Sequence, residues 1–270
     1  MADITTKGKA LPNRWGFYAG NGFGKTSMLC YAPAPIFLMT AGETGLRTLI
    51  EARQVPETPS LPELKTWPDL LAAVRFLRTE PHTYKSLVLD TANGAERMCH
   101  EYVCEVFYGG DWDGKEYGFL AWGGKGYDTA MSEWRVLLNA LDQLREERGM
   151  AIFFLMHTKL KVARNPSGPD YDKFSPEMHE KTWNLTRGWL DATLAGVSEV
   201  LVNTGKKLDR KGKVAETSHR MLYTSFDNPI FDAKNRFGLP DEIEMGTSPQ
   251  EAWNNFAEAV RESRKTGENA

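Results

Sequence analysis

The sequence predicts an α/β fold in which helices flank a mostly parallel central sheet, with a hairpin and a helix added at the C-terminal end. Two observations lead to this prediction. Short apolar runs alternate along the chain with stretches of helical periodicity, as strands and helices alternate in such folds. A glycine-rich turn also joins the first apolar run directly to a helix-like stretch.

Six apolar runs are the candidate strands. Those that begin near residues 35, 86 and 151 each follow a helical pattern and are almost free of polar residues, which is typical of strands buried on both faces of a parallel sheet. The candidate strands are residues 15–19, 35–39, 86–89, 151–156, 192–202 and 220–224.

Four helices are expected between and after these strands. Thr66 and Asp69 form a capping box at the start of one helix, and Ser248 with Glu251 marks the start of the last. The other two helices are predicted over residues 93–107 and 129–147. Three remaining stretches lack periodicity and are predicted to be exposed loops: residues 109–126, 158–180 and 203–218.

Length and composition favour one large domain. A chain of 270 residues, 41% hydrophobic and 26% charged, can bury a large core, so we assign residues 1–245 to one domain and 246–270 to a C-terminal helix and tail. Three cysteines and an N-terminus without a signal-peptide pattern predict a cytoplasmic protein. The sequence has no run of about 18 apolar residues, so we expect no membrane span. A net charge of −3 excludes a uniformly basic surface.

The strongest local signal is a phosphate-binding loop (P-loop) after the first strand. Its glycines let backbone N–H groups face phosphate oxygens, and the helix that follows presents its positive end to the same charge. Lys25 is expected to bind the β and γ phosphates of ATP, and the Thr26 hydroxyl to bind Mg²⁺. The predicted nucleotide contacts are Gly20, Asn21, Gly22, Phe23, Gly24, Lys25, Thr26 and Ser27.

One residue of this loop departs from the usual pattern. Ala19 stands where the pattern has its first glycine, and its methyl group is tolerated if this position keeps ordinary backbone angles. The alternative is a glycine-rich turn without a ligand. Gly-Lys-Thr at a strand-to-helix junction favours the phosphate site.

A second part of the site is predicted at the end of the third strand. The apolar run 86–89 is followed by Asp90, which suits the acid that holds magnesium or its bound water in ATPases of this kind. Many buried strands end in aspartate, so the assignment depends on the P-loop.

With these motifs, residues 15–240 resemble the RecA-like P-loop ATPases, and among them the short phage RadA-like proteins that assist single-strand annealing. The resemblance rests on the P-loop, the strand that ends at Asp90 and the segment 232–240. It implies a glutamate after the second strand that polarises the attacking water, and Glu43 is the matching residue. The alternative for Glu43 is an acid in the first turn of a helix.

The resemblance assigns roles to three further residues. His157 follows the fourth strand, where RecA-like proteins carry a polar residue that senses the γ-phosphate, although a lone histidine is often structural. Lys234 and Arg236 resemble the Lys-x-Arg element that such proteins insert into a neighbour's nucleotide site, with Arg236 as an arginine finger. This role implies a ring or filament of identical subunits. A charged turn is the alternative.

Two of the predicted loops occupy the places of the family's DNA loops. Residues 109–126 contain seven glycines, together with aromatic and lysine side chains that suit stacked bases and phosphates; a compact loop packed on its own aromatic residues is the alternative. The lysines after His157 suit the second DNA loop, and a third basic cluster lies between residues 206 and 213. The predicted DNA contacts are Lys115, Trp122, Lys125, Lys159, Lys161 and Arg164.

The resulting hypothesis is an ATP- and Mg²⁺-dependent ATPase that acts on single-stranded DNA in phage-type recombination or annealing. It would assemble with itself and work beside a single-strand-binding or annealing protein. One alternative is a nucleotide-switched loader or scaffold with little hydrolysis. Another is a small-molecule P-loop kinase, which lacks an evident arginine-rich lid here and leaves Arg236 unexplained.

Overall fold

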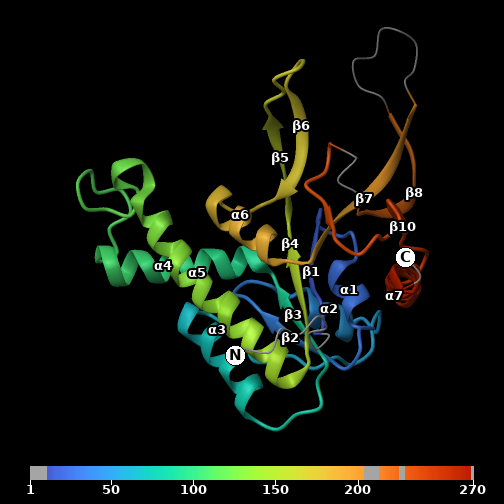
Figure 1. Ribbon diagram of the computed structural model, residues 1–270, viewed down its shortest axis with the longest axis horizontal. Helices are drawn as coiled ribbons and strands as arrows, with labels where there is room; N and C mark the ends of the chain where they lie inside the picture. Colours follow the sequence, from blue (N-terminus) through green and yellow to red (C-terminus); the bar gives the residue numbers. More distant parts are fainter. Residues whose placement is uncertain (1–10, 204–212, 225–228, 269–270) are drawn as a thin grey trace, which may run out of the picture.

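A computed structural model describes residues 11–203, 213–224 and 229–268 as three layers, with a twisted sheet between two layers of helices (Figure 1). The sheet has eight strands, in the order β10-β8-β7-β1-β4-β3-β2, with β9 paired to β7. Five strands run parallel to one another: β1 (Arg14–Ala19), β2 (Pro35–Met39), β3 (Ser86–Asp90), β4 (Ala151–Met156) and β7 (Ala192–Asn203). Three short or antiparallel strands complete it: β8 (Lys213–Tyr223), β9 (Lys234–Asn235) and β10 (Glu242–Glu244).

Successive side chains of each strand point to opposite faces of the sheet, which explains why helices cover both faces. In β1, Trp15 and Phe17 face one layer whereas Tyr18 faces the other, because successive side chains of a strand point to opposite faces. The layer on the Trp15 side contains α1 (Lys25–Leu29), α2 (Gly45–Glu51) and α7 (Pro249–Glu268). The opposite layer contains α3 (Trp67–Thr79), α4 (Ala92–Tyr108), α5 (Ala121–Arg148) and α6 (Glu180–Trp189).

The predicted α/β class and the parallel core strands are confirmed. The capping box at Thr66 and Asp69 forms, with the Asp69 N–H donating to the Thr66 hydroxyl at 3.3 Å. The last helix packs on the sheet through Phe256, whose ring lies edge-on to Phe17 at 5.2 Å. Strand β4 lies between β1 and β3, so the P-loop strand and the Asp90 strand are not adjacent.

Two of the stretches predicted as loops contain strands instead. Residues 158–180 hold the antiparallel hairpin of β5 (Thr158–Ala163) and β6 (Tyr171–Pro176), which projects beyond the sheet (Figure 1). Leu160 and Val162 of this hairpin are 62% and 60% exposed, so it lacks the buried apolar face that marks a strand in a sequence. Likewise β8 begins at Lys213, within the predicted loop 203–218, because it pairs with an extension of β7.

The predicted loop 109–126 differs in one respect. Helix α5 begins at Ala121, earlier than the expected residue 129, but Trp122, Gly123 and Gly124 interrupt it with positive φ angles. Phe119 is fully buried and its ring contacts those of Trp112 and Tyr127. The stretch is thus partly packed on its own aromatic residues, as the alternative prediction had it.

Candidate functional site

The turn after β1 has the backbone that the P-loop pattern requires. Gly22 and Gly24 adopt φ angles of 76° and 102°, a region that favours glycine. Phe23 is buried and anchors the turn against Gly196 of β7, where an added Cβ would lie 2.5 Å from the Phe23 ring. Ala19 is the last residue of β1, pairs with Gly196 and is not among the residues with positive φ. Its methyl group therefore fits without strain.

Lys25 begins α1 with its ammonium group turned back over this turn. Its Nζ donates to the carbonyl oxygens of Ala19 at 2.8 Å and Gly20 at 3.1 Å, and only 8% of the residue is exposed. Burial lowers the pKa of Lys25 to about 8, although the charges of Asp90 and Glu43 act to raise it. A buried cation held by carbonyl groups is well suited to bind a phosphate group.

Thr26 and Asp90 are brought together from α1 and the end of β3. The Thr26 hydroxyl donates to Asp90 Oδ2 at 2.8 Å. Asp90 is 4% exposed, and this burial raises its pKa to about 6, while the Thr26 hydrogen bond and the Lys25 charge act to lower it. A hydroxyl and a carboxylate are hard oxygen donors, so this pair fits Mg²⁺, which usually keeps several waters and takes few protein ligands. The described residues contain no cluster of three His, Cys, Asp or Glu side chains that could hold a metal ion.

Glu43 lies beside this pair, in the turn between β2 and α2. Its Oε1 accepts from the Thr91 hydroxyl at 3.3 Å and lies 3.4 Å from His157 Nε2. The His157 contact is the main cause that lowers the pKa of Glu43, so its carboxylate is ionised at neutral pH. Helix α2 begins at Gly45 and has no acid in its first turn, which argues against the helix-end alternative.

His157 is fixed from its backbone. Its N–H donates to Asn93 Oδ1 at 3.2 Å, and its carbonyl accepts from the Glu177 N–H at 2.9 Å. Thr91 and Asn93 were not predicted as site residues. Their positions, one and three residues after Asp90, are the sequence signal that could have identified them.

A polar hollow of about 450 Å³ opens in front of Glu43. Its walls come from the turns after β2, β3, β4 and β6 and from the first turns of α4. Glu43 and Glu177 line it, and Arg97 of α4, which also lines it, donates to the Ala41 carbonyl at 3.1 Å. The hollow is large enough for water and for part of a polar ligand next to the Glu43 carboxylate.

Lys234 and Arg236 do not reach the P-loop of their own chain. Lys234 pairs with Thr193 near the start of β7, whereas the P-loop side of β7 is at Gly196, level with Ala19. Three residues of strand separate these levels by roughly 10 Å. The Lys234 ammonium donates to the last carbonyl groups of α6, including that of Arg187 at 2.6 Å, so it acts there as a helix cap.

Arg236 is exposed at this amino-terminal edge of the sheet. No hydrogen bond or ion pair joins its side chain to any other residue in the described part of the chain. The structure therefore separates the two residues: Lys234 is occupied within its own chain, and Arg236 is available on the surface.

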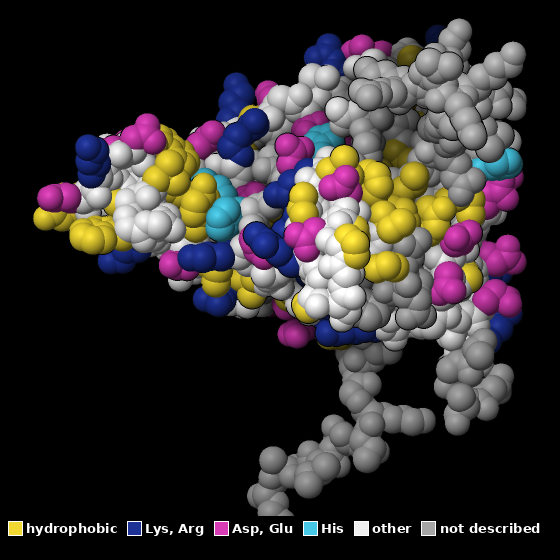
Figure 2. Space-filling model, turned by 90° about the horizontal axis from the view of Figure 1, so that it is seen from above, with side chains coloured by type: hydrophobic (Ala, Val, Ile, Leu, Met, Phe, Trp, Pro, Cys, Tyr) yellow, Lys and Arg dark blue, Asp and Glu magenta, His cyan; other side chains and the backbone are white. Residues whose placement is uncertain are grey.

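The predicted DNA contacts fall on two projections. The aromatic loop, residues 109–126, carries Trp122, 79% exposed, and Tyr117, 82% exposed, with Lys115 and Lys125 also exposed. Figure 2 shows this projection at the left, where hydrophobic side chains gather beside lysine or arginine side chains. A hollow of about 420 Å³ lies between Tyr117, Trp122 and Lys125.

The second projection is the β5–β6 hairpin. Lys159 donates to the Met178 carbonyl at 2.5 Å and Lys161 pairs with Glu180 at 3.1 Å, whereas Arg164 near the tip is exposed. Two of the three predicted cations are thus already engaged within the chain. Of the third basic cluster, residues 206–211 lie outside the described residues and Lys213 begins β8.

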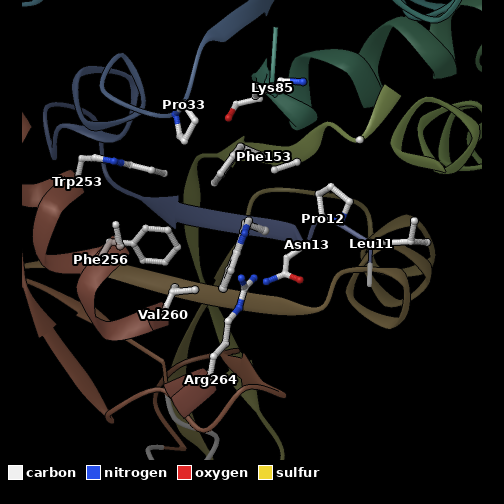
Figure 3. Close-up of a pocket in the computed structure, with 15 residues that line it drawn as sticks. Leu11, Pro12, Asn13, Pro33, Lys85, Phe153, Trp253, Phe256, Val260 and Arg264 are labelled. Carbon is white, nitrogen blue, oxygen red and sulfur yellow. The ribbon is translucent and has the colours of Figure 1, made fainter. Parts of the chain in front are cut away.

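A larger hollow, of about 720 Å³, lies at the opposite end of the sheet from the P-loop (Figure 3). Ser86 and Ala151, the first residues of β3 and β4, contribute to its wall, and Phe256 and Val260 of α7 face it. It contains none of the predicted site residues. None of the helices in the described ranges is long and apolar enough to cross a membrane.

Comparison with known proteins agrees with this geometry. Residues 11–237 match the family described as AAA domain. No curated protein matches the chain. The match covers the P-loop, Asp90, Glu43 and His157, whereas the narrower resemblance to phage RadA-like proteins stays a prediction.

Proposed function

Because the chain belongs to the AAA domain family of P-loop nucleotide-binding ATPases, we propose that it hydrolyses ATP at this site and that single-stranded DNA stimulates the reaction. One observation carries the proposal of hydrolysis. The ionised Glu43 carboxylate is held by Thr91 and His157 at the mouth of a polar hollow, beside the buried Thr26–Asp90 pair.

Each group at the site has a distinct task in this proposal. The backbone N–H groups of residues 20–24 and the Lys25 ammonium would bind the phosphates of ATP. Thr26 and Asp90 would hold Mg²⁺, which neutralises phosphate charge when bound. Glu43 would orient a water in the hollow and accept its proton, and His157 would keep the Glu43 carboxylate in place.

We further propose that Arg236 acts on the site of a neighbouring subunit. It is exposed at the end of the sheet opposite its own P-loop, so in its own chain it does not contribute to the site. A guanidinium group supplied from a neighbour would stabilise charge that develops on the transferred phosphoryl group. The active form would then be an assembly of identical subunits.

The DNA proposal rests on the aromatic loop. Exposed Trp122 and Tyr117 beside Lys115 and Lys125 offer ring faces for bases and cations for phosphates, the combination found in proteins that bind single strands. A role in phage-type recombination or annealing agrees with this surface. The engaged state of Lys159 and Lys161 favours a restricted hairpin contact centred on Arg164.

The deciding experiment measures ATP turnover of the intact protein with and without single-stranded oligonucleotides, at low salt. We expect turnover that DNA increases and that Lys25→Ala abolishes. Tight ATP binding without turnover, in the presence of DNA, would instead support the nucleotide-switched loader or scaffold. Absence of ATP binding would contradict both functions.

A further inference from the structure

Arg220 of β8 contacts the phosphate-binding turn that follows β1. Its guanidinium donates to the Phe23 carbonyl at 3.1 Å and to the Gly246 carbonyl at 3.1 Å. Strand β8 is separated from β1 by β7, so this contact joins the turn to the outer part of the sheet (Figure 1). Nothing in the P-loop pattern specifies it.

The hydrogen bond to the Phe23 carbonyl constrains the peptide group between Phe23 and Gly24. In a planar trans peptide the C=O of one residue and the N–H of the following residue point in opposite directions. Holding the Phe23 carbonyl toward Arg220 therefore turns the Gly24 N–H to the side away from Arg220. Gly24 is the residue directly before Lys25, and its N–H belongs to the set expected to bind phosphate.

The space around Gly24 gives an independent indication. Gly24 has a φ of 102°, and a Cβ built on it would lie 2.8 Å from an Arg220 guanidinium nitrogen. The guanidinium thus lies where a side chain would otherwise project. Glycine at position 24 allows the positive φ angle and also leaves room for the Arg220 guanidinium.

The other end of the contact is firmly held. The Met245 N–H donates to the Arg220 carbonyl at 2.8 Å, and β10 pairs with β8 from Glu244 opposite Met221. Gly246 itself directly precedes the Thr247–Glu251 contacts that begin α7. Arg220 therefore links the glycine-rich turn to the part of the molecule where β8, β10 and the start of α7 meet.

We propose that Arg220 is a positioning residue for nucleotide binding, which fixes the Phe23–Gly24 peptide so that the Gly24 N–H is ready for a phosphate oxygen. The inference rests on the proposed nucleotide site. The planar fork of arginine suits two carbonyl acceptors at once, whereas lysine would place a single ammonium between them.

The test compares Arg220→Ala and Arg220→Lys with the intact protein. Arg148→Ala is a matched control, because Arg148 also donates to two backbone carbonyl groups, those of Arg78 and Glu80, at the other end of the sheet. The first measurement is hydrogen exchange of the backbone amides of residues 20–24 without nucleotide. We expect exchange about tenfold faster in Arg220→Ala and unchanged in the control.

The second measurement is the Kd for a fluorescent ATP analogue with Mg²⁺. We expect a Kd increased about 10- to 100-fold in Arg220→Ala, with a smaller increase in Arg220→Lys and the same melting temperature in the lysine variant. Unchanged exchange and Kd in Arg220→Ala would overturn the proposal. If the alanine variant does not fold, unchanged exchange and Kd in Arg220→Lys would overturn it. Failure of the intact protein to bind the analogue would refute the nucleotide site, while the exchange result would still decide the role of Arg220 in the turn.

Discussion

Replacement of Glu43 by glutamine should abolish ATP hydrolysis and leave the fold and ATP binding almost unchanged. The side chain keeps its size and one oxygen acceptor, but it loses the charge that accepts a proton. General-base catalysis contributes about 10²- to 10⁴-fold, so turnover should fall by that factor. His157 would remain beside residue 43, because its position is also fixed by Asn93.

The structure limits the effect of this substitution on stability. Glu43 is 29% exposed, and its contacts with Thr91 and His157 measure 3.3 and 3.4 Å. Such long contacts together stabilise the fold by about 1 kcal/mol. The melting temperature should therefore fall by no more than about 2–4 °C in a chain of this size.

Single-turnover hydrolysis of bound ATP, an ATP-binding titration and a thermal melt test these three expectations. Glu63→Gln is the matched control, since Glu63 Oε1 accepts from the Gly42 N–H in the same turn at 3.0 Å and the amide oxygen keeps that bond. A Glu43→Gln protein that hydrolyses ATP within about tenfold of the normal rate would refute the assignment of Glu43 as the base.

Four further outcomes are expected. Lys25→Ala should abolish ATP turnover while circular dichroism stays unchanged, because within the described residues the Lys25 ammonium donates its hydrogen bonds to the carbonyl groups of the turn and to no core side chain. Trp122→Ala should weaken binding of single-stranded DNA by about 1–3 kcal/mol with little change in its salt dependence, whereas Arg164→Ala should reduce the salt slope. Arg236→Ala should bind ATP but hydrolyse it slowly, and mixing it with Lys25→Ala subunits should restore part of the activity. Glu96 of α4 is buried, and its carboxylate accepts from the His179 N–H at 3.0 Å. Burial raises the pKa of Glu96 to about 7, so the stability that it contributes below about pH 4 is lost as the pH rises through 7; Glu96→Gln should remove about 1–3 kcal/mol of that loss, measured by urea unfolding at pH 5 and pH 8.

These outcomes have clear controls. Phe76→Ala removes an aromatic residue that is 50% exposed, on α3 away from the aromatic loop, and should leave DNA binding unchanged. Equal losses in Phe76→Ala and Trp122→Ala would argue against a specific contact at the loop. No recovery of ATPase activity in co-assembled mixtures would exclude Arg236 as a residue that acts between subunits. If the free energy of unfolding of Glu96→Gln depends on pH as in the intact protein, groups other than Glu96 cause that dependence.

The sequence was informative wherever a local pattern determines the structure. Buried parallel strands are apolar throughout, so β2 and β4 could be located to the residue. The P-loop and Asp90 were identified because the turn needs glycines and the acid ends a buried strand. The contact of Glu43 with His157 agrees with the family resemblance that placed both residues at one edge.

The features that were not predicted depend on contacts between residues that are far apart in the chain. The β5–β6 hairpin has no buried face, and its lysines and exposed Leu160 follow no pattern that distinguishes it from a loop. Lys234 was predicted to enter a neighbour's nucleotide site, but its hydrogen bonds to carbonyl groups at the end of α6 could not be read from the sequence. Arg220 lies near the turn because of the order of the strands in the sheet, and the local sequence around Arg220 does not encode that order.

The point where β4 passes into the β5–β6 hairpin has a mechanical consequence. His157 is the single residue between β4 and β5, and the Glu177 N–H closes the base of the hairpin on its carbonyl. Phe174, halfway along β6, is also anchored to the body of the domain, because its N–H donates to the Ile230 carbonyl at 2.7 Å and its carbonyl accepts from the Asp232 N–H at 3.1 Å. Only the outer three residue pairs of the hairpin, roughly 10 Å of its length, lie beyond this anchor. A load on the tip would therefore bend the hairpin at Phe174 and leave the contact between His157 and Glu43 in place.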